Sequence, residues 1–412
     1  MTKTQDPNPM SELSLSPRVA RSRIVRSRID KLGLFLALIV FVGLYLQPFA
    51  LVRANRILAP QARRLWESLP ASGVASTLIG LSLTLVVLAA PVKARLRVIA
   101  IVAATLLLLL AMGHAGAFLS PPDSPFARVS PGSGFWIVFA AYLIAIADGL
   151  VRLRLGPVAR LWALAAAVLG IGAFLALGAW DDLSILKEYR THADVFWREA
   201  GNHVFLAGGS LAAAAAVGIP LGILCYRFAP VRSSVLNILN VVQTIPSIAL
   251  FGLLMAPLAW IAAKVPGASA LGIAGIGPAP AFIALFAYAL LPIVSNTAAG
   301  LAGIPPQARD AAMGVGMTSA QRLFQVELPL ALPVILTGIR VVLVQNIGLA
   351  VIAALIGGGG LGVFIFQGIN QTATDLVLMG TLPVVAMAFV AAILLDALVD
   401  LNRATDSRRA ET

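Results

Sequence analysis

Residues 98–119 read VIAIVAATLLLLLAMGHAGAFL and carry apolar side chains on every face that a helix would present. About 20 such residues cross the hydrocarbon layer of a membrane as an α-helix, which satisfies its own backbone hydrogen bonds there. The other structure that spans membranes, the β-barrel, needs strands in which apolar and polar residues alternate over about ten positions. This stretch has no such alternation, so it predicts a membrane-spanning helix.

The rest of the chain has the same character. Of its 412 residues, 59% are hydrophobic and 12% are charged, and the mean hydropathy is +0.92. Soluble domains contain about 45–50% apolar and about 25% charged residues, so a water-soluble core cannot absorb this composition. We therefore expect an all-α integral membrane protein with about ten transmembrane helices. The predicted spans are residues 32–52, 74–92, 98–119, 135–151, 161–180, 204–226, 235–262, 281–300, 333–356 and 376–398.

The distribution of polar residues divides the chain near residue 185. Before this point the spans have few polar interruptions, whereas glycine, proline and amide residues lie inside the later ones. A membrane tolerates such positions where a helix faces protein or a water-filled path, so we expect the transport path in the second half. The predicted parts are a basic cytoplasmic tail (1–31), a block of about five transmembrane helices (32–185), an external amphipathic segment (186–203), a core of about five transmembrane helices (204–400) and a cytoplasmic tail (401–412).

The formal net charge of +12 comes from arginine and lysine residues that gather at the ends of the apolar runs. Nucleic acid binding requires a basic face on a soluble module, so we expect no nucleic acid partner. Under the positive-inside rule, the basic clusters place both termini and residues 305–329 in the cytoplasm. The loop that carries Arg53, Arg56, Arg63 and Arg64 departs from this rule, because it falls on the outer side.

Residues that carry catalysis or hold cofactors are scarce. Cys225 is the single cysteine, and its place in an apolar run indicates a small buried side chain. His114, His192 and His203 have no spacing that makes a metal pair, so we expect no metal and no cofactor. The glycines at 357–360 are followed by no Lys-Ser or Lys-Thr, so they predict a tight turn at the outer end of the ninth span and no nucleotide site. We expect no catalysis in this chain.

Residues 304–329 read IPPQARDAAMGVGMTSAQRLFQVELP, which is too polar to cross the membrane and too regular for a random loop. Pro305 and Pro306 can open a helix, since a missing N–H costs little in the first turn. We expect Gly316 to end this helix. Helical spacing places four small residues on one face: Ala308, Ala311, Ala312 and Val315.

A second short helix is expected to follow over about residues 320–326. Thr318 or Ser319 can cap its start, and Pro329 should break it before the next span. The product is a short helix with a small, flat face, lying across the ends of the spans in the cytoplasm. This shape is suited to docking.

The order of residues in this loop resembles the EAA loop of ATP-binding-cassette importer permeases. The resembling residues are Asp310-Ala311-Ala312, Gly316, Val326 and Leu328-Pro329. The resemblance implies a coupling helix that docks into a groove of an ATPase subunit, with Asp310, Ala311, Ala312 and Gly316 at the contact. Asp310 departs from the family's usual Glu, which keeps the charge on a shorter side chain.

Stretches over residues 200–400 resemble the type I permeases for glycine betaine, choline, carnitine and related quaternary amines. The resembling stretches are 243–250, 288–297, 326–333, 338–340, 345–348 and 356–362. The resemblance implies a permease subunit in the bacterial cytoplasmic (inner) membrane, embedded in the lipid bilayer. Its implied partners are ATP-binding cassette ATPase subunits, an extracytoplasmic substrate-binding protein and a second permease subunit, identical or different.

Polar residues inside the core spans are the candidates for the translocation path. Amides are costly in lipid and therefore face the bundle or the path. Gln243 and Pro246 fit either a gate or a kink with a packing hydrogen bond. The candidate path residues are Gln243, Pro246, Asn296, Gln345 and Asn346.

Arg340 lies near the cytoplasmic end of the ninth span and has three possible roles. It can bind a carboxylate substrate, extend to lipid headgroups or pair with Glu327.

Other classes of protein make different demands on the sequence. An ion-coupled secondary transporter requires ionisable groups at mid-membrane and an inverted repeat, and a membrane enzyme requires a convergent nucleophile, acid pair or metal cluster. Neither set is evident here. An importer permease for another small solute, such as an amino acid or an oxyanion, remains the alternative to an osmolyte permease.

Overall fold

The computed structural model describes residues 30–55, 58–120 and 127–411, with residues 402–411 described as backbone alone. Within these ranges nine helices are long and apolar enough to cross a membrane, and a shorter apolar helix covers Lys31–Leu46. The prediction of an all-α membrane protein with about ten spans is confirmed. Residues 1–29 of the predicted basic tail lie outside the described part.

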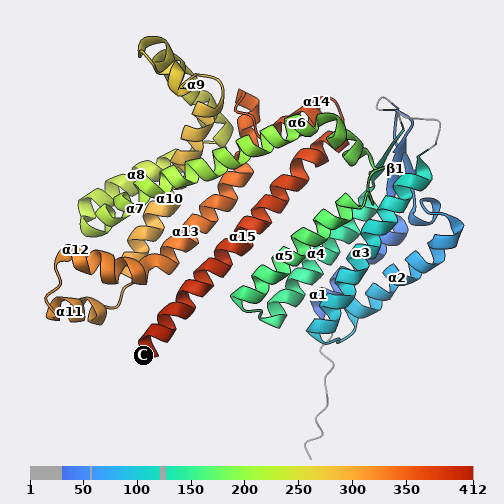
Figure 1. Cartoon of the computed structure of the whole chain (residues 1–412), viewed down its shortest axis with the longest axis horizontal. Coiled ribbons are helices and arrows are strands. Elements are labelled where there is room, and N and C mark those ends of the chain that lie inside the picture. The colour runs from blue at the N-terminus through green and yellow to red at the C-terminus, as the bar shows by residue number, and fades with distance from the viewer. Residues whose placement is uncertain (1–29, 56–57, 121–126, 412) are drawn as a thin grey trace, which may run out of the picture.

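The first half consists of helices with a small sheet at one end (Figure 1). Its elements are α1 (Lys31–Phe41), a π-helical turn (Val42–Leu46), β1 (Ala50–Arg53), β2 (Gln61–Arg63), a 3-10 turn (Leu65–Glu67), α2 (Ala71–Ala89), α3 (Ala94–Leu119), β3 (Arg128–Pro131), α4 (Ser133–Leu153) and α5 (Pro157–Ala176). The sheet has the order β2-β1-β3 and is antiparallel, with Ala50 opposite Arg63 on one side and Pro131 on the other.

The predicted first span, 32–52, is wrong at its C-terminal end. The helix stops at Leu46, and Gln47 is extended, with φ −103° and ψ 152°. A residue that precedes proline is disfavoured in helical geometry, and Pro48 follows here. Residues 50–53 then pair as β1, so the arginine-rich segment that departed from the charge rule contributes Arg53 and Arg63 to a sheet.

The second half is helical throughout, apart from its turns. Its elements are α6 (Ser184–Val204), a π-helical turn (Phe205–Gly209), α7 (Ser210–Arg227), α8 (Ala229–Thr244), α9 (Ser247–Lys264), a 3-10 turn (Ser269–Leu271), α10 (Pro278–Ala302), α11 (Pro306–Gly314), α12 (Ser319–Arg322), a π-helical turn (Leu323–Glu327), α13 (Leu328–Leu349), a 3-10 turn (Ile352–Ile356), α14 (Gly362–Asn370) and α15 (Thr374–Glu411). The predicted external segment 186–203 lies on α6, which continues through α7 as one long helix. The predicted span 235–262 is wrong as a single helix, because the chain breaks between α8 and α9 at Ile245-Pro246.

The two halves have separate buried cores. The first core runs from Leu36 to Leu183 in the sequence, and it includes Tyr142, whose hydroxyl lies 2.8 Å from Thr84 Oγ1. The buried clusters of the second half begin at Leu206. Close helix crossings in the first half depend on glycine, since a Cβ on Gly33 of α1 would lie 2.1 Å from the Leu88 carbonyl oxygen of α2. Small residues at such crossings permit the tight packing that holds helices together in lipid.

Polar contacts join the halves near the sheet. Ser184 Oγ lies 3.0 Å from the Val129 carbonyl oxygen and 2.7 Å from Asp375 Oδ1 of α15, and its single hydroxyl proton can be donated to either oxygen. Arg128 of β3 pairs with the buried Glu188 of α6 at 3.3 Å. Helix α6 therefore ties β3 to the start of α15.

The glycine-rich turn predicted at 357–360 is confirmed by its backbone geometry. Gly357, Gly359 and Gly360 have φ of 76°, 75° and 86°, values that side chains rarely permit. The Gly360 N–H donates to Glu199 Oε2 at 2.7 Å, so the turn is fastened to α6.

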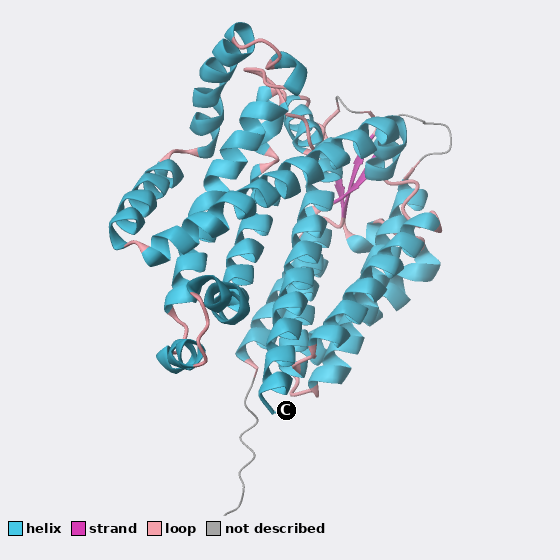
Figure 2. Cartoon of the chain, turned by 60° about the vertical axis from the view of Figure 1, so that its left-hand side comes forward, coloured by secondary structure: helices cyan, strands magenta, loops and turns pink. Residues whose placement is uncertain are grey.

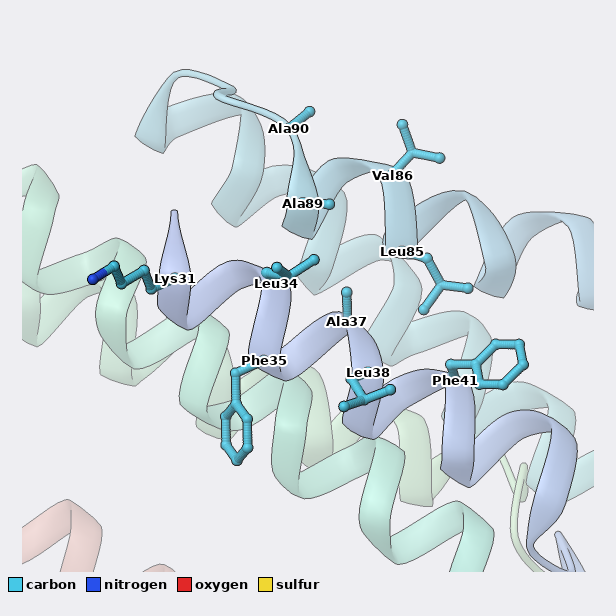
Figure 3. Close-up of a pocket in the computed structure, with 10 residues that line it drawn as sticks. All are labelled: Lys31, Leu34, Phe35, Ala37, Leu38, Phe41, Leu85, Val86, Ala89 and Ala90. Atoms are coloured by element: carbon cyan, nitrogen blue, oxygen red, sulfur yellow. The ribbon is translucent and has the colours of Figure 1, made fainter. Parts of the chain in front are cut away.

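An open, apolar groove of about 850 Å³ runs between α1 and α2 (Figure 3). Phe35, Leu38 and Phe41 line it from α1, and Lys31 stands at one end. These apolar side chains are exposed in the isolated chain, as expected of a surface that lipid covers.

The elements outside the long helices gather at two ends of the bundle. Figure 1 shows the start of α1, the α11–α12 segment and the C-terminus at one end, and the sheet, α6 and α14 toward the other. Figure 2 shows the same separation between the strands and the C-terminus.

Asp30 makes several polar contacts at the end of the bundle where α1 starts. It caps α1 by accepting from the Gly33 N–H at 3.2 Å, and it pairs with Arg97 at 2.5 Å and Arg152 at 2.9 Å. Burial alone would raise the pKa of Asp30, but the bonds from Arg97 and Gly33 and the charges of both arginines lower it overall. Because the folded pKa is depressed, this stabilisation is present above the unfolded pKa of about 3.9 and is lost as the pH falls through the folded value.

Asp30→Asn should therefore lower the thermal stability of the detergent-solubilised protein at pH 7. The expected loss is on the order of 2 kcal/mol, between the values for exposed and buried pairs. Lys31→Gln, a change at an exposed neighbour, is the control and should have little effect. The difference between Asp30→Asn and wild type should shrink below about pH 4; a constant difference would contradict the ion-pair account.

Candidate functional site

The loop between α10 and α13 forms a compact helical hairpin, residues 306–327, which we call the docking hairpin. Its first helix, α11, starts directly after Pro305 and has Gly314 as its last helical residue and Val315 as its C-cap, so Gly316 directly follows and ends the helix, as predicted. Gly316 has φ +81° and reverses the chain. The predicted cap at Thr318 is confirmed, since its Oγ1 accepts from the Gln321 N–H at 3.3 Å and its own N–H donates to Gln321 Oε1 at 2.9 Å.

The predicted break at Pro329 is wrong. Residues 319–349 form one continuous helical stretch, with a π-helical turn at Leu323–Glu327 directly before Pro329. A proline in a helix removes one hydrogen bond and crowds the preceding turn. The wider π-helical turn relieves this crowding, so the docking hairpin continues into α13 without a break.

The four small residues predicted to share one face of α11 are divided between two faces. Ala312 is buried, with 4% of its surface exposed, and Ala308 is half-buried against the cluster around Leu301. Ala311 and Val315 are exposed, as are Asp310 and Gly316. Ala308 and Ala312 are four residues apart and face the protein, whereas Ala311 and Val315 are rotated outward.

The exposed face of the docking hairpin carries large apolar side chains. Val315 is 75% exposed, Phe324 67% and Met313 51%. No periodic pattern in the sequence marks Met313 and Phe324, so their place on this face could not be predicted.

The break between α8 and α9 is fastened to α10 by a reciprocal pair of hydrogen bonds. Gln243 Nε2 donates to the Tyr288 carbonyl at 2.8 Å, and the Tyr288 hydroxyl donates to the Ile245 carbonyl at 2.5 Å. The Tyr288 carbonyl would ordinarily accept from residue 292, but Pro292 has no N–H. The amide of Gln243 therefore replaces the bond that Pro292 removes.

The other predicted path residues lie in different surroundings. Asn296 Nδ2 donates to the Pro292 carbonyl at 2.8 Å, and a Cβ on Gly338 of α13 would lie 2.8 Å from the Asn296 Cβ. Asn346 is fully buried and donates to Ser210 Oγ of α7 at 2.9 Å. Gln345 is half-buried. The amides of Gln243 and Asn346 thus bond to neighbouring helices, whereas the Asn296 amide bonds to its own helix, which packs closely against Gly338 of α13.

One ion pair links α13 to α15 in the core. Arg340 pairs with Asp396 of α15, so the alternative in which it pairs with Glu327 is wrong. Among the described residues, no group of three His, Cys, Asp or Glu side chains is placed to hold a metal ion.

Two family models match the chain. The model described as "ABC transporter permease YehY, N-terminal domain" covers residues 30–186, and the model described as "Binding-protein-dependent transport system inner membrane component" covers residues 218–403.

Curated relatives match the second half. Osmoprotectant import permease protein OsmW of Salmonella typhimurium is 43% identical over 46% of this chain and 82% of its own length. Carnitine transport permease protein OpuCB of Listeria monocytogenes is 38% identical, covering 46% and 79% of the two chains. Choline transport system permease protein OpuBB of Bacillus subtilis is 38% identical, covering 42% and 73%. Among solved structures, an inward-facing MetNI methionine ABC transporter aligns with 22% identity and a TM-score of 0.44, over 52% of this chain and 98% of that chain.

Gln243→Leu should destabilise the protein by about 1–3 kcal/mol, because it leaves the Tyr288 carbonyl without a donor in a nearly buried site. Thr244→Val is the matched control, since the Thr244 hydroxyl bonds only to the Val241 carbonyl of its own helix. Combining Gln243→Leu with Tyr288→Phe should be non-additive by at least about 0.5 kcal/mol in thermal unfolding. Strict additivity would show that the two bonds are independent.

Proposed function

The chain belongs to the family of binding-protein-dependent transport system inner membrane components, the translocation subunits of ATP-binding-cassette importers, and we propose that it forms the path for osmoprotectants such as glycine betaine, choline or carnitine. The resemblance drawn from the sequence motifs is thereby confirmed. The printed names of three relatives, for osmoprotectant, carnitine and choline transport, support the cargo class.

The docking hairpin is the observation that carries the proposal. It lies at one end of the bundle (Figure 1), where it leads into the helical stretch 319–349, and Met313, Val315 and Phe324 are exposed on it. Exposed apolar side chains grouped on a polar loop mark a protein-binding surface. We assign this surface, with Asp310, Ala311 and Gly316, to the ATPase subunit, while Ala312 supports it from the buried side.

We infer that the docking hairpin lies in the cytoplasm, together with both termini. It shares its end of the bundle with the start of α1 and with the C-terminus, and Arg97, Arg152 and Arg227 lie at ends of helices there (Figure 1). The positive-inside rule favours this orientation. The predicted inner-membrane location follows from the family, and the sheet and α6 then face outside.

The complete importer is expected to contain two permease subunits, identical or different, two ATPase subunits and an external substrate-binding protein. ATP hydrolysis belongs to the ATPase subunits, so this chain performs no catalysis. The core over residues 204–400 would provide the path, and the block over residues 32–185 would flank it. The ATPase dimer would close on ATP and move the docking hairpins, which switches the path between two states.

The mildly polar side chains of the core are suited to a solute that passes through without binding tightly. Quaternary ammonium groups are captured mainly on aromatic faces, a task for the binding protein, so the path needs only mildly polar groups. We propose Gln243, Pro246, Asn296, Gln345 and Asn346 as the polar positions that line or shape it. Asn346 is buried in this conformation, where it bonds to Ser210 of α7. Its role would be to exchange this bond for another when α7 separates from α13.

Val315→Asp should weaken ATPase binding. A charge on an apolar anchor commonly costs at least about 2 kcal/mol, which corresponds to roughly a 30-fold weaker complex. Leu271→Asp is the matched control, because Leu271 is 83% exposed in the turn after α9, away from the docking hairpin. The measurement is copurification of the ATPase with the membrane-inserted variants. Equal recovery with Val315→Asp and Leu271→Asp would remove the docking assignment.

The reconstituted complex should take up glycine betaine or choline when ATP is supplied inside vesicles. Because ATP drives the transport, a proton uncoupler should not reduce the initial rate. The measurement is radiolabelled uptake into vesicles that contain the permease, its ATPase and its binding protein. Uptake of an amino acid or an oxyanion without competition from betaine or choline would overturn the cargo and leave the importer assignment in place.

A further inference from the structure

Glu327 is a buried carboxylate at the point where the docking hairpin joins α13. It is 2% exposed, and it ends the π-helical turn Leu323–Glu327. A charge in such a position is costly unless other charges compensate it. In the proposed transport function, Glu327 has no assigned role.

Three arginines from three different elements surround this carboxylate. Arg322 of α12 donates to Glu327 Oε1 at 3.0 Å. Arg309 of α11 and Arg227 at the end of α7 each approach it at 3.9 Å. One carboxylate therefore connects both helices of the docking hairpin to a helix of the transmembrane core.

Arg309 extends this connection further into the core. Its guanidinium lies over the Tyr226 ring, 5.3 Å from the centroid, and it donates to the Leu301 carbonyl at the end of α10. The α11 helix is thus held against α7 and α10 by the same side chain that faces Glu327.

The charge cluster is not fully closed in this conformation. Glu327 Oε2 and Arg309 Nε are buried and make no hydrogen bond within the described structure. The two arginines at 3.9 Å are near enough to attract the carboxylate but are not hydrogen-bonded to it. A small displacement of α11 or α7 can therefore exchange the hydrogen-bonded arginine without removing the charge compensation.

We propose that Glu327 is a positioning residue that couples the docking hairpin to the transmembrane core, so that ATP-driven movement of α11 is transmitted to α7, α10 and α13. This inference rests on the proposed importer function. Without the negative charge, the three arginines repel one another, and the docking hairpin loses the ion pair between Glu327 and Arg227 of α7. The ATPase still binds to the outer face, but its movement displaces the core less.

Glu327→Gln tests this role because it keeps the shape of the side chain and removes its charge. The readout is solute taken up per ATP hydrolysed in reconstituted vesicles, alongside ATPase copurification. We expect the ratio to fall by about tenfold, within the roughly 5- to 150-fold range of common coupling energies, while the ATPase remains bound. Asp181→Asn is the matched control, since it breaks the exposed ion pair with Arg190 of α6, away from the docking hairpin, and it should leave the ratio within about twofold.

A second variant covers the case in which Glu327→Gln fails to assemble. Arg309→Gln removes the contribution of α11 and leaves Glu327 paired with Arg322, and it should also lower uptake per ATP. The coupling role would be overturned if the assembled variants took up as much solute per ATP hydrolysed as wild type. This includes the case in which uptake and ATP hydrolysis fall in the same proportion. Absence of ATP-driven uptake in wild type would instead overturn the proposed function, so the two failures are distinct.

Discussion

The dominant constraint on this chain is that backbone groups inside a membrane have no water to bond, so every interruption of a helix requires a replacement partner. The α8–α9 break shows how this is met. Pro292 leaves the Tyr288 carbonyl without its ordinary donor, and the Gln243 amide supplies one. The Tyr288 hydroxyl also donates to the carbonyl of Ile245, the residue that follows α8. The irregular part of the core is therefore fixed by side chains of a neighbouring helix, and α8, α9 and α10 are positioned together.

Much of the fold could be predicted from the sequence, because hydrophobic length alone determines which segments cross a membrane. The predicted helix boundaries failed at prolines, because a proline can either end a helix or lie inside one. Pro246 ends a helix, whereas five other prolines lie inside helices: Pro220, Pro257, Pro292, Pro333 and Pro383. The outcome depends on which neighbours accept the freed groups, which is a tertiary property. The strand at 50–53 was missed for a related reason, since a short apolar strand and the end of an apolar helix have the same composition.

The position of the candidate docking site was also predictable, since it followed from a motif whose order is local. Its orientation was not. Ala308 and Ala312 face the protein and Ala311 faces outward because the packing of α11 against Leu301 and its neighbours sets the rotation of the helix. The exposed Met313 and Phe324, and the arginines around Glu327, come from separate turns and helices, so their association is not visible in sequence spacing.

Two carboxylates with little exposed surface, Asp30 and Glu327, each face several arginines at the same end of the bundle, but their geometry differs in a way that matters for motion. Asp30 is hydrogen-bonded to its own helix and forms ion pairs at 2.5 and 2.9 Å, so it fixes α1, α3 and α4. Glu327 has one close arginine and two at 3.9 Å, with one oxygen unbonded. Since hydrophobic burial does not drive helices together in lipid, polar contacts and close packing decide which helices move as one. The first half is then held as a rigid unit, whereas the core retains an adjustable contact at the site where the docking hairpin enters it.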